Sequence, residues 1–146
     1  MPRYLLDVNV LLALVDEAHP HHQRCHQWLA KQERLRWASS PLTENGFVRI
    51  LSSTAYPNRV ERASQAISML IELRANVGEH EFWPDDLSLT EAAFFNLSLL
   101  SFSKHLTDIY LVALAVKHEG FLVTFDRRIT VTAIPGATSK HVLVPE

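Results

Sequence analysis

The stretch "RYLLDVNVLLAL", residues 3–14, decides how the rest of the chain is interpreted. The apolar residues before Asp7 suit a short buried strand, and those after Asn9 recur at helical spacing. The pattern predicts a strand over 3–6 and a helix over 9–18. A carboxylate at that junction is costly in an apolar interior unless another group compensates its charge. We therefore expect Asp7 either to have a compensating partner or to lie at an edge where its charge has a function.

The same alternation of short apolar strands and helices continues along the chain. Further strands are predicted over 35–40, 80–86, 121–126 and 140–145, and further helices over 21–34, 41–53, 58–76, 90–102 and 107–120. Such alternation is typical of an α/β fold with a mainly parallel sheet. No Ser-, Gly- or Pro-rich tract divides the chain, so we expect residues 1–146 to form one domain.

Several of the expected helices have local signals at their ends. Ser40 followed by Pro41 is a good N-cap and first helical position. Thr107 and Gly120 are expected to cap the two ends of the helix between them. The helix over 58–76 has the clearest apolar face. The residues expected to point to the core from it are Val60, Ala63, Ile67, Leu70 and Ile71.

The composition favours a cytoplasmic protein without a membrane anchor. No apolar stretch approaches the ~20 residues of a membrane span, and no basic segment precedes an apolar signal region. Cys25 is the single cysteine, so no internal disulfide forms, as expected in a reducing compartment. The net charge is −2, from 14 Lys and Arg against 16 Asp and Glu. Proteins that bind many phosphates are usually strongly basic, so any recognition of nucleic acid must be local.

Four acidic residues occupy equivalent places in the expected elements. Asp7 and Asp126 each follow an apolar strand, whereas Glu44 and Asp108 each begin a helix. The carboxyl ends of parallel strands share one edge of the sheet, where α/β folds bind ligands, so the four acids can converge there. Taken singly, each acid is better explained locally, Asp7 and Asp126 as turn or cap residues and Glu44 and Asp108 as acids favoured at a helix start.

Convergence of the four acids would require a cation. Two carboxylates ~4 Å apart repel by roughly 4 kcal/mol at an effective dielectric constant of about 20. No Lys or Arg is equally placed in these motifs. Oxygen-rich acidic sites suit hard divalent cations. The sequence therefore predicts a Mg²⁺ or Mn²⁺ site that compensates Asp7.

Three segments together resemble a known family. "LLDVNVLLAL", "LTENGFVRIL" and "TDIYLVALAVKHEGFLVTFDRR" are similar to the PIN-domain nucleases and, within them, to the VapC toxins of bacterial toxin–antitoxin pairs. The resemblance runs from residue 4 to about residue 128, and later residues carry no motif. Ile109 stands where relatives often have Ala. The residues that match the family pattern are Asp7, Asn9, Glu44, Asp108, Thr124 and Asp126.

The resemblance implies an α/β/α sandwich and a metal-dependent endoribonuclease. It implies that a Mg²⁺ or Mn²⁺ cofactor assists hydrolysis of RNA, and that the chain is the toxin of a type II pair, a homodimer inhibited by an antitoxin. We expect Asp7 and Asp108 to ligate the main ion directly. Glu44 and Asp126 would act mainly through bound water, with a second ion at Asp126 as an option.

Each neutral or basic neighbour of the four acids has two possible roles. Asn9 and Thr124 either orient the carboxylates or are local turn residues. The basic residues beside the motifs either contact RNA phosphates or are solvated loop residues. These candidates are Arg127, Arg128, Lys104 and His105.

Other residues suited to binding have a simpler structural reading. The stretch "HPHHQRCH", residues 19–26, offers possible zinc ligands, but it lacks a second separated pair, so a polar helix start is the better interpretation. Trp37, Trp83 and Phe47 could stack on bases, although burial in the core is favoured.

Three other functions remain open at this point. One is a PIN-fold nuclease that processes RNA outside a toxin–antitoxin pair, and another is a binding module without activity. The third is an Asp-dependent phosphatase, which would need a second Asp two residues after the first. Asn9 occupies that position and argues against it.

Overall fold

A parallel sheet forms the centre of the molecule. The computed structural model describes residues 2–100 and 103–146. Within them, five strands pair in the order β3-β2-β1-β4-β5, and each pairing is parallel. The strands are β1 (Tyr4–Leu6), β2 (Arg36–Ser39), β3 (Glu79–Phe82), β4 (Phe121–Val123) and β5 (Val142–Leu143).

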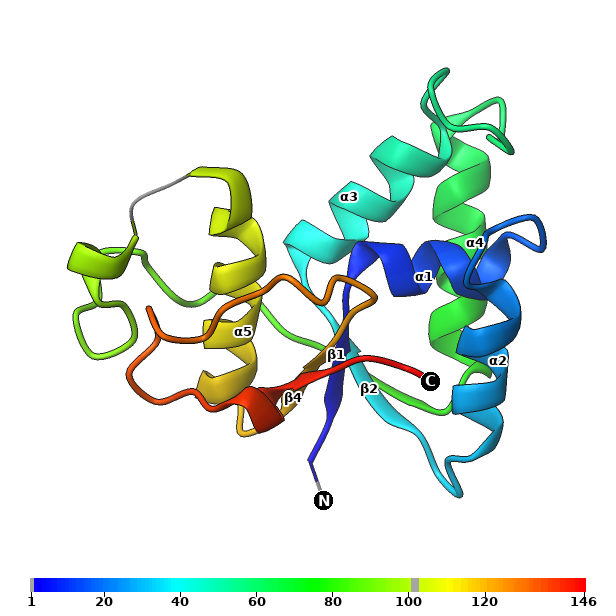
Figure 1. Cartoon of the computed structure of the whole chain (residues 1–146). Helices are drawn as coiled ribbons and strands as arrows, with labels where there is room; N and C mark the ends of the chain where they lie inside the picture. Colours follow the sequence, from blue (N-terminus) through cyan, green and yellow to red (C-terminus); the bar gives the residue numbers. More distant parts are fainter. Residues whose placement is uncertain (1, 101–102) are drawn as a thin grey trace.

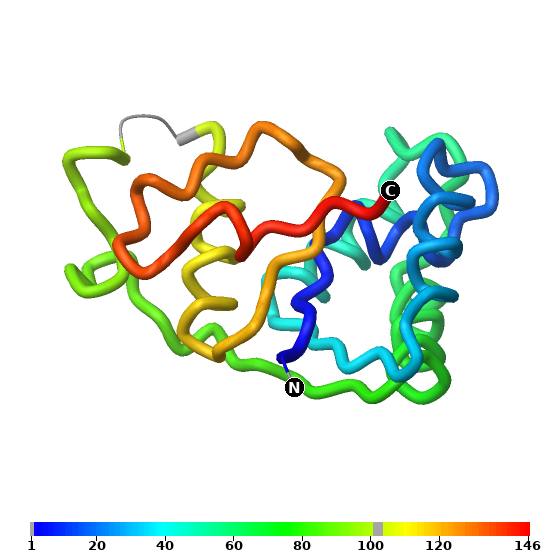
Figure 2. The backbone as a smooth tube through the Cα atoms, turned by 60° about the horizontal axis from the view of Figure 1, so that its bottom comes forward, coloured from blue at the N-terminus to red at the C-terminus, as the bar shows by residue number. Residues whose placement is uncertain are grey.

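Helices cover both faces of this sheet (Figure 1). The helices are α1 (Val8–Val15), α2 (His22–Ala30), α3 (Pro41–Leu51), α4 (Ala63–Asn76) and α5 (Leu106–Lys117). Helices α1 to α4 lie on one side of the sheet. Helix α5 lies on the other side, together with the segments that precede and follow it in sequence. Figure 2 shows the same division from a second direction. The arrangement is the α/β/α sandwich expected from the sequence.

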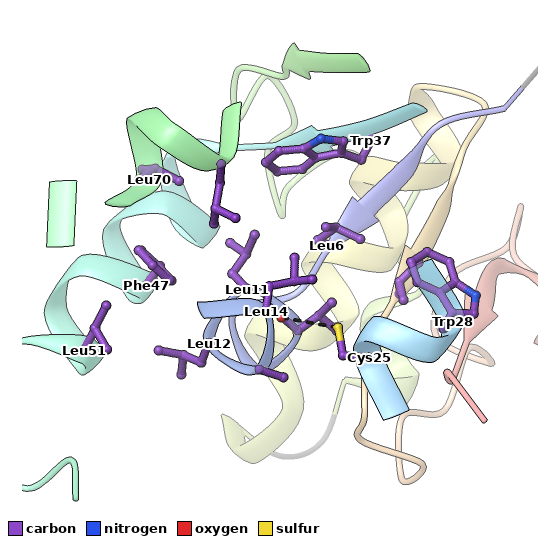
Figure 3. Close-up of a cluster of buried hydrophobic side chains, with 14 of the residues drawn as sticks. Leu6, Leu11, Leu12, Leu14, Cys25, Trp28, Trp37, Phe47, Leu51 and Leu70 are labelled. Carbon is purple, nitrogen blue, oxygen red and sulfur yellow. Dashed lines mark hydrogen bonds between the residues drawn. The ribbon is translucent and has the colours of Figure 1, made fainter. Parts of the chain in front are cut away.

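Alternation along the strands supplies a separate core for each face. Leu6 and Trp37 are fully buried against α1 to α4, and Figure 3 shows them among the leucines of α1. Leu5 and Ala38, each one residue away, are fully buried against α5 instead. Phe47 and Trp83 are also buried, so the prediction that the large aromatic residues belong to the core is confirmed.

The single thiol is part of the first core. Cys25 is fully buried, and its Sγ lies 3.8 Å from the carbonyl oxygen of Val10 (Figure 3). Burial raises the pKa of this thiol to about 12. The contact joins α2 to α1.

Helix ends match the sequence signals at α3 but not at α5. Ser40 caps α3, and its side chain and that of Thr43 each accept a backbone N–H of the other. Thr107 lies within α5 rather than at its cap, because the helix begins at Leu106. At the other end, Glu119 takes the left-handed conformation expected of Gly120 (φ 57°). Gly120 is required for another reason: a Cβ there would lie 2.5 Å from the carbonyl oxygen of Arg3.

The prediction of a helix over 90–102 is wrong. In its described part, residues 90–100, only Leu97–Leu99 form a short 3₁₀ turn, and residues 101 and 102 lie outside the described residues. Asn96 accepts hydrogen bonds from the backbone N–H and the hydroxyl of Ser98, at 3.2 and 2.7 Å. Such side-chain bonds compete with helical ones.

The apolar face predicted for α4 is also wrong in part. Ala66, Leu70 and Leu73 point to the core, whereas Ile67 and Ile71 are 47% and 59% exposed. The buried and the exposed apolar residues of α4 both recur at spacings of three and four. Periodicity alone therefore does not show which set faces the core. None of the helices in the described ranges is long and apolar enough to cross a membrane.

Candidate metal centre

The acids expected to converge lie at the carboxyl edge of the sheet. Asp7 directly follows β1 and is the N-cap of α1. Its backbone N–H donates to the carbonyl oxygen of Val123, the last residue of β4, at 2.9 Å. Asp126 follows β4 by three residues, and Asp108 lies in the first turn of α5. The ends of two neighbouring strands and a helix start therefore meet here, as the sequence predicts.

Asp7 is a buried carboxylate held by neutral donors. Only 7% of the residue is exposed. Its Oδ1 accepts the N–H of Val8, and its Oδ2 accepts the hydroxyl of Thr124, both at 2.7 Å. Burial, and to a smaller extent the charges of Asp108 and Asp126, raise the pKa of Asp7 to about 6. Both of these donors are neutral, and their hydrogen bonds do not offset the effect of burial on the pKa.

Thr124 and Asn9 belong to a hydrogen-bond network around Asp7. The Thr124 hydroxyl donates to Asp7, and its oxygen accepts the side-chain amide of Asn9 at 3.3 Å and the N–H of Asp126 at 3.1 Å. The Asn9 oxygen in turn accepts the N–H of Phe125 at 3.3 Å. Thr124 thus links Asp7 to Asp126, and Asn9 supports this link from the side of α1.

Asp108 and Asp126 form a group with His105. One ligand atom from each of the three residues lies within 4.8 Å of the others, and it is the one such group found in the described ranges. Burial and the charge of Asp126 raise the pKa of Asp108. His105 Nδ1 lies 3.8 Å from Asp108 Oδ2. The sequence marked His105 only as a candidate phosphate contact.

Glu44 has a separate set of contacts. Its Oε2 accepts the hydroxyl of Ser39 at 2.5 Å and pairs with Arg74 at 3.2 Å. The Ser39 oxygen also lies 2.7 Å from His80 Nε2. Because the single hydroxyl hydrogen goes to the carboxylate, His80 must donate to Ser39. Glu44 is therefore not in the group formed by Asp108 and Asp126.

The sequence motifs indicated that no Lys or Arg is placed to pair with the four acids. This prediction is wrong for two of them. Arg74 pairs with Glu44, and Arg128 donates to Asp126 at 3.1 Å. The Arg128 contacts lower the pKa of Asp126. Arg128 stands two residues from Asp126, so this pair could have been predicted from the sequence. Arg74 stands thirty residues away and reaches Glu44 because α4 packs on α3, which no local pattern reveals.

Oxygen donors suited to a divalent ion are present at this edge. Asp108 and Asp126 bring carboxylate oxygens together, and Asp7 lies close enough that, besides burial, the charges of both raise its pKa, although it is not in their group with His105. Such donors fit Mg²⁺ or Mn²⁺ better than a softer metal. Of the predicted basic residues, Arg127 is 60% exposed and lies 3.9 Å from Glu146, and Lys104 is also exposed.

Comparison with known proteins identifies the family of this chain. The PIN domain family matches residues 4–135. Ribonuclease VapC44 of Mycobacterium tuberculosis is 45% identical over 139 residues, which cover 95% of this chain and 96% of the relative. Ribonuclease VapC39 of the same organism is 37% identical over 90% of this chain and 94% of its own length, and Ribonuclease VapC38 is 39% identical over 84% of each. The chain therefore belongs to the PIN-domain family, in its VapC branch.

Proposed function

We propose that this protein is a divalent-metal-dependent endoribonuclease that hydrolyses phosphodiester bonds in RNA. The observation that carries the proposal is the meeting of buried Asp7 with Asp108 and Asp126 at the carboxyl edge of a PIN-domain sheet. The similarity to VapC ribonucleases along nearly the whole chain supports RNA as the substrate.

Each residue of the centre has a proposed role. Asp7 and Asp108 would hold Mg²⁺ or Mn²⁺ directly, and Asp126 would act through a water molecule. Glu44, which lies outside the group formed by Asp108 and Asp126, would act through further water molecules. When bound, the ion supplies an activated water and neutralises charge on the phosphodiester. Thr124 keeps the Asp7 carboxylate turned toward the site. The placement of His105 beside Asp108 suits a proton donor to the leaving oxygen.

We also propose that the chain is the toxin of a type II pair, with an antitoxin as its partner and a second copy of itself in a homodimer. Exposed apolar residues support protein partners, because such surfaces are typical of binding sites. Ile67 and Ile71 are exposed on α4, and Leu42 and Leu89 line an open groove of about 430 Å³. On this proposal residues 1–146 act as one domain in the cytoplasm.

The other candidate functions have less support. A PIN-fold nuclease outside a toxin–antitoxin pair would use the same site and differ only in its partners. A phosphatase would need an acid where Asn9 stands, and Asn9 is already engaged with Thr124 and Phe125.

Cleavage of RNA by an Asp108→Asn variant tests the proposal. We expect activity with Mg²⁺ or Mn²⁺ to fall by more than about 100-fold, because even groups that only support metal ligands contribute about 10- to 100-fold. Asp86→Asn is the matched control, since Asp86 also pairs with a His side chain, and in addition with Lys117, but near the opposite end of α5. Full activity of Asp108→Asn, or activity of the parent protein in EDTA, would contradict the proposed centre.

A further inference from the structure

An open pocket adjoins the candidate metal centre. Its volume is about 560 Å³, and Asn9 and Asp126 form part of its wall. Another part of its wall comes from the loop between α1 and α2, which carries His19 and His21. The pocket thus continues outward from the centre, and the His-rich stretch singled out in the sequence lines it.

Three rings form a row along this wall. The rings of His21 and Phe125 are stacked, with centroids 4.4 Å apart and planes 15° apart. The His19 ring follows, with its centroid 5.7 Å from that of His21. Phe125 directly precedes Asp126, so the row begins at the centre. His19, His21 and Phe125 are each only half-buried.

Burial and nearby charges favour the neutral form of the two His rings, since the pKa of each is lowered. His19 Nδ1 accepts the N–H of His21 at 3.0 Å, which requires an unprotonated nitrogen. His21 Nδ1 lies 3.4 Å from the Arg24 guanidinium, which donates to it. Burial, followed by the charges of Arg24 and Arg127, lowers the pKa of His21. The wall therefore presents uncharged π surfaces flanked by permanent cations.

The start of this loop is firmly anchored. Asp16 is buried, and its Oδ1 accepts the N–H of Ala18 at 2.9 Å and the amide of Asn58 at 2.6 Å. Its other oxygen accepts the hydroxyl of Tyr56. A loop held at its start by three donors is preorganised.

The remaining His residues of the stretch fasten the far end of the loop. His22 Nδ1 lies 2.6 Å from the carbonyl oxygen of Ala13, and His26 Nε2 lies 2.9 Å from that of Leu14. These carbonyls belong to the last turn of α1, where a helix lacks its own donors. His22 and His26 are therefore structural donors, which agrees with the interpretation of this stretch as a helix start.

We propose that this pocket binds one single-stranded nucleotide of the RNA substrate beside the cleaved bond, with its base stacked on the rings of His19 and His21. The phosphate of that nucleotide contacts Arg127. Arg128 is already paired with Asp126, whereas the ion pair of Arg127 with Glu146 is 3.9 Å long and exposed. Aromatic rings with nearby cations are the usual means of holding single strands. The inference rests on the proposed function.

Fluorescence of 2-aminopurine tests the stacking directly, because this base is quenched when it stacks. Short single-stranded RNAs, each with one 2-aminopurine, would be titrated onto the Asp108→Asn protein with Mg²⁺. We expect one position to be quenched. His21→Ala should abolish that quenching and weaken binding about tenfold. His21→Phe should retain both, because it keeps the ring.

Arg127→Ala tests the phosphate contact, with Arg49→Ala as its control. Both arginines are exposed, and Arg49 lies on α3 and does not line the pocket. We expect Arg127→Ala to weaken binding by about tenfold while quenching at saturation remains, and Arg49→Ala to bind like the parent. The His21 side chain makes no N-cap bond to α2, so His21→Ala should fold normally.

The outcomes separate this inference from the proposed function. If the protein with intact Asp108 cleaves RNA but His21→Ala binds within about twofold of the parent and is fully quenched, the subsite is wrong and the nuclease assignment stands. If no RNA is cleaved but quenching depends on His21, the subsite stands and the nuclease assignment fails. If His21→Ala loses thermal stability but binds RNA as the parent does, the three rings serve only to pack the fold. That outcome would overturn the subsite.

Discussion

Asp7 shows how one side chain can oppose the stability of its own fold. It is buried and accepts two hydrogen bonds from neutral donors, yet its pKa is raised because burial outweighs those bonds. Asp126 is the opposite case, since the Arg128 contacts lower its pKa. Two acids at the same edge of the sheet therefore have opposite effects on unfolding.

Asp7→Asn is expected to stabilise the metal-free protein at neutral pH. The folded state keeps the Asp7 proton more tightly than the unfolded state, so stability is lost as pH rises from about 4 to about 6. The rise in pKa from 3.8 to about 6 corresponds to about 3 kcal/mol, an upper value for the gain. Urea denaturation in EDTA would measure it, and the gain should vanish near pH 4.

Asp126→Asn is the control for this measurement. Its carboxylate has a lowered pKa, so its contribution to stability is present above the ordinary Asp pKa and is lost as pH falls. We expect this variant not to gain stability at neutral pH. A marked loss of stability in Asp7→Asn would show that Asp7 serves the fold and not a cation.

At the level of elements, the interior strands and the capped helices were the most predictable. The cap at Ser40 rests on interactions between near neighbours, and the strand before Asp7 is marked by a run of apolar residues that the sheet buries. The helix expected over 90–102 failed because apolar content does not distinguish a buried coil from a helix. There Phe95 is buried while Leu97 and Leu99 are exposed.

Helix α4 illustrates a second limit, because it carries two apolar stripes. Leu70 is buried, whereas its neighbour Ile71 is exposed. We expect Leu70→Ala to lower the free energy of unfolding by about 2–5 kcal/mol, as deletion of a buried Leu usually does. Ile71→Ala should change it by no more than about 0.5 kcal/mol, as is usual at the surface. Urea denaturation of the two variants compares them, and equal losses would show that Ile71 also belongs to the core.

Across the whole molecule, the sequence predicted the sheet edge but not the full set of contacts there. Asp7, Asp108 and Asp126 could be placed together because parallel strands have a shared carboxyl edge. The pairing of Arg74 with Glu44 depends on how α4 packs on α3, over a long separation in sequence. The row from His19 to Phe125 depends likewise on a loop meeting the end of β4. Neither contact has a local signal.

Binding of a divalent ion should stabilise the whole fold. At an ion concentration about 100 times its dissociation constant, the native state gains about 2.7 kcal/mol. The gain should be larger at neutral pH than at about pH 5, because Asp7 and Asp108 must lose their protons to bind. Thermal unfolding with Mg²⁺ or Mn²⁺ measures it, with Asp108→Asn as a variant that should respond weakly. The absence of any shift in the parent would contradict the site.

The burial of Cys25 makes this residue a natural probe of local opening in the core. Because the sequence has one thiol and that thiol is fully buried between α2 and α1, a thiol reagent can react only after this part of the core opens. The rate of alkylation at Cys25 therefore measures how often the α1–α2 unit separates. The loop that holds His19 and His21 joins these two helices, so the same rate follows the integrity of the proposed RNA subsite without any introduced label.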